Sequence, residues 1–131
     1  REVKQRMKWE REAREAERLL RRLGANGSYM GFWFTVYGIA MVMREPELLT
    51  YMCKGLYEAV ASHFNVSLQS AERNIRTIKK RIWKYGDEEL LREIFGRSTQ
   101  KSPKNAVFLD GLAAYLNERC MGEPPGEERR L

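Results

Sequence analysis

The sequence has little of what metal sites, histidine-based catalysis and disulfide scaffolds require. It contains one histidine, His63, and two cysteines, Cys53 and Cys120, which are far apart in the chain. This set matches no common zinc-ligand spacing and no nucleophile paired with a histidine. Two cysteines are too few for a disulfide scaffold, so we expect free, buried or half-buried thiols in a reducing compartment. We predict no metal, no cofactor and no enzymatic activity.

The chain also lacks an apolar leader and an apolar run of membrane-spanning length. Its first 23 residues are strongly charged, which is unlike a secretory signal. The apolar stretch 29–43 is about 15 residues long, whereas a spanning helix needs roughly 20. We therefore expect a buried helix there and a protein of the cytoplasm.

The residues that are present predict one all-α domain. The 131 residues are 43% hydrophobic and include 3 Trp, 6 Tyr and 5 Phe, which is enough for the core of one domain. No strand-like alternation and no internal repeat is visible. We predict an amphipathic helical arm at residues 1–23, a compact six-helix domain at 24–120 and a disordered tail at 121–131.

Caps and breakers place the six helices. Pro46 opens the second, Ser67 caps the fourth and Gly86 ends it, and Ser102 caps the sixth with Pro103 at its first position. The expected helices are residues 28–43, 47–52, 54–63, 68–85, 87–95 and 102–120.

The third and fourth of these helices have the sequence pattern of a helix-turn-helix. A short apolar helix is followed by a break of three or four residues and then by a longer helix. On a helical wheel the longer helix separates into two faces. The apolar stripe is Leu68, Ala71, Ile75, Ile78 and Ile82, and the opposite face is Gln69, Arg73, Arg76, Thr77, Lys80 and Lys84.

The positive charge is concentrated on two helices. Residues 67–85 carry six basic residues and one acidic residue, and residues 1–23 carry nine basic and five acidic residues, in a chain of net charge +6. A solvated helix face is the ordinary explanation of such charge. The basic face of 68–85, however, lacks the opposite-sign spacing of i,i+4 ion pairs, and its first half carries polar side chains suited to base edges. We therefore predict that it binds duplex DNA.

The position of each polar side chain along this helix suggests its role. Gln69, Arg73, Arg76 and Thr77 lie in the half that meets base edges in the major groove. The cations nearer the C-terminus are better placed for phosphates, and they are Lys79, Lys80, Arg81 and Lys84. Ser102 and Lys104 open the sixth helix, where free N–H groups can hold another phosphate or simply be capped.

The chain resembles the C-terminal effector domain of the sporulation-initiation response regulator family (sporulation stage zero protein A). The residues that carry the resemblance cover about residues 22–120. They are Gly31-Phe-Trp-Phe, Glu47-Leu48-Leu49, Leu56-Tyr57, Ala61 with Phe64-Asn65, Glu72-Arg73-x-Ile75-Arg76, Trp83, Leu91, Phe95-Gly96, Pro103-x-Asn105 and Phe108.

The resemblance implies a six-helix DNA-binding domain that regulates transcription, in a bacterial cell and at its nucleoid. It implies that Glu72, Arg73 and Arg76 read bases in the major groove. The next position is often His in the family and is Thr77 here. Full-length members also carry a phosphorylatable receiver domain before this one.

The N-terminal arm has an apolar seam at heptad spacing. Its residues are Trp9, Ala13, Ala16, Leu20 and Leu23. The predicted helix 31–43 is apolar nearly all round, with Val36 and Tyr37 at positions that are often charged in the family. Such a helix needs cover on more than one face. We expect the seam to supply it, either within one chain or from the partner in a homodimer.

A second hypothesis comes from another functional class. The chain would be a helical protein-interaction or dimerisation module in which residues 1–23 dock a partner and the basic helix is merely solvated. A salt titration with duplex DNA separates the two, because affinity that rests on phosphate contacts falls steeply as salt rises.

Overall fold

The computed structural model describes residues 2–96 and 101–121 of the chain, with side chains for 10–96 and 101–119. Its elements in chain order are α1 (Glu2–Arg22), α2 (Met30–Arg44), the 3₁₀ turn η1 (Pro46–Leu49), the π-helical η2 (Cys53–Tyr57), α3 (Glu58–Phe64), α4 (Leu68–Tyr85), α5 (Glu88–Phe95), α6 (Asn105–Leu116) and the π-helical η3 (Asn117–Met121). These ranges contain no strand, so the predicted all-α class is confirmed.

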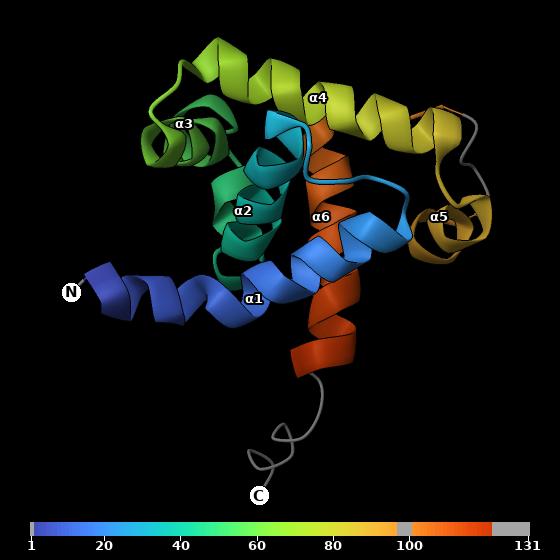
Figure 1. The fold of residues 1–131 in the computed structure, drawn as a ribbon, viewed down its shortest axis with the longest axis horizontal. Coiled ribbons are helices and arrows are strands. Elements are labelled where there is room, and N and C mark those ends of the chain that lie inside the picture. The colour runs from blue at the N-terminus through green and yellow to red at the C-terminus, as the bar shows by residue number, and fades with distance from the viewer. Residues whose placement is uncertain (1, 97–100, 122–131) are drawn as a thin grey trace, which may run out of the picture.

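The helices are arranged around α2 and α6, which run through the middle of the molecule (Figure 1). α4 lies across one end of this pair and α1 crosses it further along, while α3 and α5 lie on opposite sides. Most of α2 is buried, as its lack of a polar face predicts. The largest fully buried side chains are Phe32, Phe34, Phe108, Leu19, Leu20, Leu23, Ile39, Leu56, Ile75, Ile78, Ile82 and Leu109.

The arm packs onto α2 of its own chain. This agrees with the first of our two alternatives, in which the seam covers the helix within one chain and not from a partner. Ala16, Leu20 and Leu23 are fully buried. The seam is wider than predicted, because Leu19 and the carboxylate residue Glu12 are buried as well, each 2% exposed. The side chain of Trp9 lies outside the described residues.

The second and sixth helices differ from the prediction. Instead of a helix over 47–52 the chain forms only η1, and α6 begins at Asn105 rather than at Ser102. The first backbone bond of α6 runs from the Phe108 N–H to the Lys104 oxygen at 2.9 Å, so Ser102 and Pro103 precede the helix and cap nothing.

The cysteine prediction is wrong for Cys53 in one respect. Its thiol is free, as expected, but exposed, because the core-facing positions of η2 belong to Leu56 and Tyr57. The side chain of Cys120 and the tail 122–131 lie outside the described part of the chain. None of the described helices has the length and apolar character needed to cross a membrane.

Candidate nucleic-acid interface

The turn between α3 and α4 has three residues, within the three or four that the sequence predicts. Asn65 ends α3 in the left-handed conformation, with φ 58° and ψ 51°. Asparagine tolerates this region better than most residues because its short side chain bonds locally. Ser67 then caps α4 by accepting a hydrogen bond from the Ser70 N–H at 3.0 Å. These local contacts fix the chain direction at which α4 begins.

Long-range contacts set the position of α4 on the core. Its buried stripe is Ala71, Ile75, Ile78 and Ile82, each at most 1% exposed. Gly31 in α2 allows the closest approach, since a Cβ there would lie 2.4 Å from the backbone oxygen of Asn74 in α4. Leu68, predicted for the same stripe, is instead 43% exposed, because it lies at the first residue of the helix.

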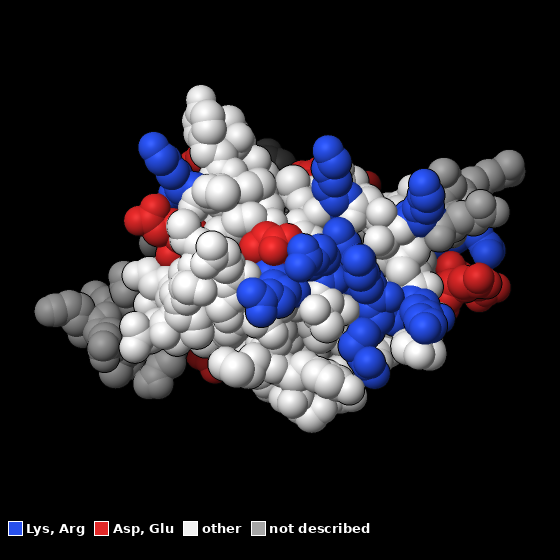
Figure 2. Space-filling model, turned by 90° about the horizontal axis from the view of Figure 1, so that it is seen from above, with Lys and Arg blue, Asp and Glu red and all other residues white. Residues whose placement is uncertain are grey.

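The opposite face of α4 is exposed and basic. Gln69, Arg73, Thr77, Lys80 and Lys84 are exposed, and Arg76 is half-buried. Viewed from the α4 side, Lys and Arg gather across the middle of the molecule with one small acidic patch beside them (Figure 2). The structure thus brings together on one surface the residues predicted to read bases and most of those predicted to contact phosphates.

One ion pair on this face contradicts the sequence interpretation. We expected no i,i+4 pair, yet the Arg76 Nη1 atom lies 3.1 Å from the Glu72 Oε2 atom. Glu72 is the single acidic residue of α4, and it holds the guanidinium of Arg76 close to the helix. The hydroxyl of Thr77 donates to the Arg73 backbone oxygen at 3.0 Å and keeps its lone pairs as acceptors.

Lys79 is one of the cations that the sequence analysis predicts to contact phosphates, and its position in the structure differs from those of the others. It is only 5% exposed. Burial lowers the pKa of its ammonium group, and the neighbouring charges of Lys80 and Arg76 lower that pKa further. The helical repeat turns Lys79 away from the face that carries Arg73 and Lys80. A phosphate contact from Lys79 does not fit this burial.

The start of α6 adjoins the first half of α4 through a residue that we did not single out as functional. The side-chain amide of Asn105 donates to the Tyr57 hydroxyl at 2.9 Å and, more weakly, to the Glu72 backbone oxygen at 3.4 Å. Burial raises the pKa of Tyr57, which favours the neutral hydroxyl. Asn105 and Tyr57 appear in the family resemblance, which was the one signal of this contact. Next to them, Lys104 is exposed and Ser102 is half-buried.

A family model described as the C-terminal domain of sporulation initiation factor Spo0A matches residues 16–116. The match begins within α1 and ends at the last residue of α6. It therefore includes the turn, the whole of α4 and the elements that hold α4 in place.

In the described residues, no three His, Cys, Asp or Glu side chains come together as a metal site.

Proposed function

The chain belongs to the family of the Spo0A C-terminal domain, a family of DNA-binding effector domains in transcription regulation, and on this premise we propose that α4 is its recognition helix. In this proposal α4 lies in the major groove of duplex DNA and reads its sequence. The observation that carries the proposal is the exposed basic face of α4, which follows a three-residue turn and lies opposite a fully buried stripe.

The proposed base-reading group lies in the first half of α4. Arg73 and Arg76 are long enough to reach guanine, where one guanidinium bonds both O6 and N7. Gln69 and Thr77 lie on either side of the two arginines. The amide of Gln69 suits adenine, and the hydroxyl of Thr77 can bond a donor or an acceptor on a base edge. Glu72 either accepts from cytosine or, through its ion pair, orients the guanidinium of Arg76.

The proposed phosphate contacts surround this group. On α4 they are Lys80, Arg81 and Lys84, all exposed. Ser102 and Lys104 come from the segment before α6, which adjoins α4 through Asn105. We leave Lys79 out of the set because it is buried. A cytoplasmic, nucleoid-associated location goes with this function.

The protein-interaction module remains the alternative, together with the predicted homodimer through residues 1–23 and helix 31–43. Three residues of the seam that would form the dimer, Ala16, Leu20 and Leu23, are already buried within one chain. The molar mass of the full chain in solution tests dimerisation directly. DNA binding that is weak at every salt concentration would favour the interaction module.

The decisive experiment begins with selection of bound duplexes from a random pool. We expect Arg73→Ala and Arg76→Ala each to cost about 1–3 kcal/mol of binding free energy on the selected site and much less on random DNA. Lys80→Ala should weaken both alike and reduce the salt slope by about one. Arg14→Ala is the control, because Arg14 lies in the middle of α1, whereas the end of α4 is approached by the residues that follow the C-terminal end of α1 (Figure 1). Equal losses on both DNAs for all three α4 variants would refute the base-reading assignment.

A further inference from the structure

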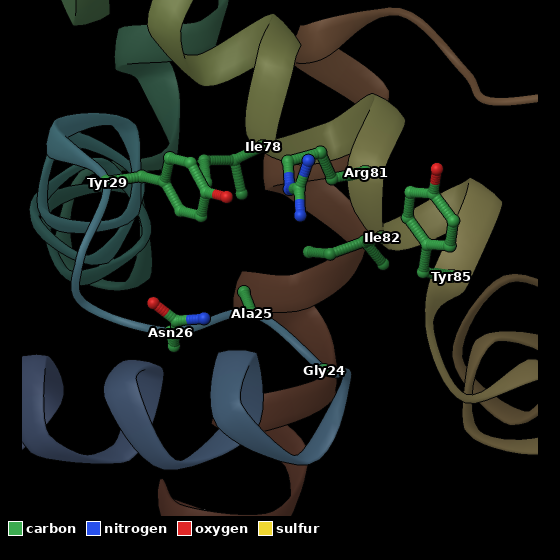
Figure 3. A pocket seen from close by; sticks show the side chains of 8 residues that line it. All are labelled: Gly24, Ala25, Asn26, Tyr29, Ile78, Arg81, Ile82 and Tyr85. Atoms are coloured by element: carbon green, nitrogen blue, oxygen red, sulfur yellow. The ribbon is translucent and has the colours of Figure 1, made fainter.

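Arg81 is held between two tyrosine rings at the edge of a small pocket. Its guanidinium carbon lies 4.7 Å from the centre of the Tyr29 ring and 5.6 Å from that of Tyr85. Tyr29 belongs to the connection between α1 and α2, so this contact joins segments far apart in the sequence (Figure 3). Stacking of this kind stabilises a cation and limits the freedom of its side chain.

The pocket lies between the C-terminal half of α4 and the α1–α2 connection. Ile78 and Ile82 line its α4 side, while Gly24, Ala25 and Asn26 line the other. Figure 3 shows Tyr29, Arg81 and Tyr85 along one edge and Asn26 facing them across the opening. The site thus combines a cation, aromatic walls and an amide on one concave surface.

Two side chains at this opening, Asn26 and Arg81, offer hydrogen-bond donors. Both hydrogen bonds from Ser28 to Asn26, from its N–H at 2.9 Å and its hydroxyl at 2.6 Å, use the Asn26 Oδ1 atom. The amide NH₂ of Asn26 therefore stays available, with no partner in the described part of the chain. Within those same residues Arg81 makes no ion pair with a carboxylate. Donors and a fixed guanidinium without a counter-charge suit an oxyanion.

The position of Arg81 on α4 indicates that this oxyanion is a phosphate of the DNA backbone. With 3.6 residues per turn, Arg81 lies about 80° around the helix axis from Arg73, on the flank toward the α1–α2 connection. A helix in the major groove has the backbone of one DNA strand along each flank, where phosphates fix the register of the protein. The flank that carries Arg81 therefore faces one strand when Arg73 faces the bases.

We propose that Arg81, Tyr29, Tyr85 and Asn26 form a preorganised cradle for one phosphodiester group of the DNA strand on the α1–α2 side of α4. This inference rests on the proposed function and adds a second segment of the chain to the interface. Arg81 donates to the phosphate oxygens, the two rings hold its guanidinium in place, and Asn26 adds a donor from the opposite wall. Tyr29 and Tyr85 are positioning residues in this arrangement.

The test is a backbone scan of the selected duplex with single methylphosphonate groups, each of which removes one phosphate charge. For the wild-type chain, substitution at the cradled phosphate should lower affinity about tenfold. In Arg81→Gln the same substitution should have no effect, and the salt slope should fall by about one. The base preference should stay unchanged, because Arg73 and Arg76 are untouched.

Three further variants separate the cradle from a simple surface charge. Arg81→Lys keeps the charge but loses the planar fork, so it should retain the salt slope and lose most of the effect at the single phosphate. Tyr29→Leu should reduce that effect, while Tyr29→Phe, which keeps the ring, should preserve it. Arg14→Gln in α1 is the control for net charge and should match the wild type within about twofold. Thermal unfolding verifies that each variant is folded.

The outcomes distinguish the cradle from the proposed function. If Arg81→Gln leaves every phosphate effect and the salt slope as in the wild type, the cradle is wrong while α4 can still read bases. A wild-type chain that binds no duplex at low salt overturns both proposals. An Arg81→Lys variant equal to the wild type at every phosphate would show that a point charge suffices and that the stacked guanidinium forms no cradle.

Discussion

The side-chain amide of Asn105, at the start of α6, donates a 2.9 Å hydrogen bond to the hydroxyl of Tyr57, the residue immediately before α3. Both residues are 7% exposed. Because the same amide also approaches the backbone of Glu72 in α4, it links η2, which leads into α3, and α4 to the start of α6. A polar contact inside the molecule thus joins the start of α6 to the helix that presents the basic face.

We expect Tyr57→Phe to lower the free energy of unfolding by about 1–2 kcal/mol, because it leaves a buried amide with its weaker partner alone. Urea denaturation measures the change. Tyr51→Phe is the matched control, since Tyr51 is 73% exposed, and should stay within about 0.5 kcal/mol of the wild type. Equal effects of the two substitutions would show that the buried hydroxyl has no structural role.

The glycines of α2 give a second prediction. Gly31→Ala should destabilise the fold by about 1–3 kcal/mol, because the new Cβ would lie 2.4 Å from the rigid backbone oxygen of Asn74 and push α4 away from α2. At Gly38 the nearest atoms, on Leu56 and Leu109, lie 3.8–3.9 Å from a Cβ, which is ordinary contact. Gly38→Ala should therefore stabilise the protein by about 0.5–1 kcal/mol through helix propensity. Thermal unfolding of both variants measures whether their stabilities change in opposite directions. A stabilising Gly31→Ala would contradict the close approach of α2 and α4.

Local signals explain which parts of the interface the sequence predicted to the residue. Ser67 and Gly86 bound α4 where expected, because a capping side chain and a glycine act within one turn. The start of α6 was wrong because the position of Asn105 depends on Tyr57, 48 residues away. No local pattern reports such a contact.

Burial of charge was the other feature that the sequence did not predict. The periodicity of α1 places Ala16 and Leu20 in the core, but it does not predict that Glu12 is buried beside them and paired with Arg44 of α2. Lysine is usually a surface residue, yet Lys79 is likewise buried. The contact of Arg81 with Tyr29 depends on how α1 docks, which a helical wheel of α4 alone does not contain.

The pair of Glu12 and Arg44 leads to a third prediction. The Arg44 Nε atom lies 2.9 Å from Glu12 Oε2, and the Glu12 side chain is 3% exposed. We expect Arg44→Gln to destabilise the protein by about 1–3 kcal/mol, because a buried carboxylate loses its charged partner. Adding Glu12→Gln should recover part of this loss by removing the buried charge. Urea denaturation of the single and double variants tests the coupling, and purely additive losses would argue against it.

The one histidine gives a prediction about pH. The ring of His63 stacks on Tyr37 with the centroids 3.9 Å apart and lies edge-on to Phe64. This burial lowers the pKa of His63 below its usual 6.5, because the neighbouring rings remove water that would solvate the imidazolium. The unfolded chain then takes up the proton at a higher pH than the folded one. The free energy of unfolding should therefore fall as the pH drops below about 6.5 toward the folded-state pKa.

Because the chain has one histidine, its imidazole signals in an NMR titration belong to His63 without further assignment. We expect a midpoint below about 6.5 in the folded protein. Tyr37→Leu, which removes the stacked ring, should move the midpoint up toward that value. His63→Asn should flatten the stability profile between about pH 5.5 and 6.5, a window in which ordinary carboxylates are already ionised. A midpoint at or above 6.5 in the wild type would mean that the stack on Tyr37 does not exclude water from the ring.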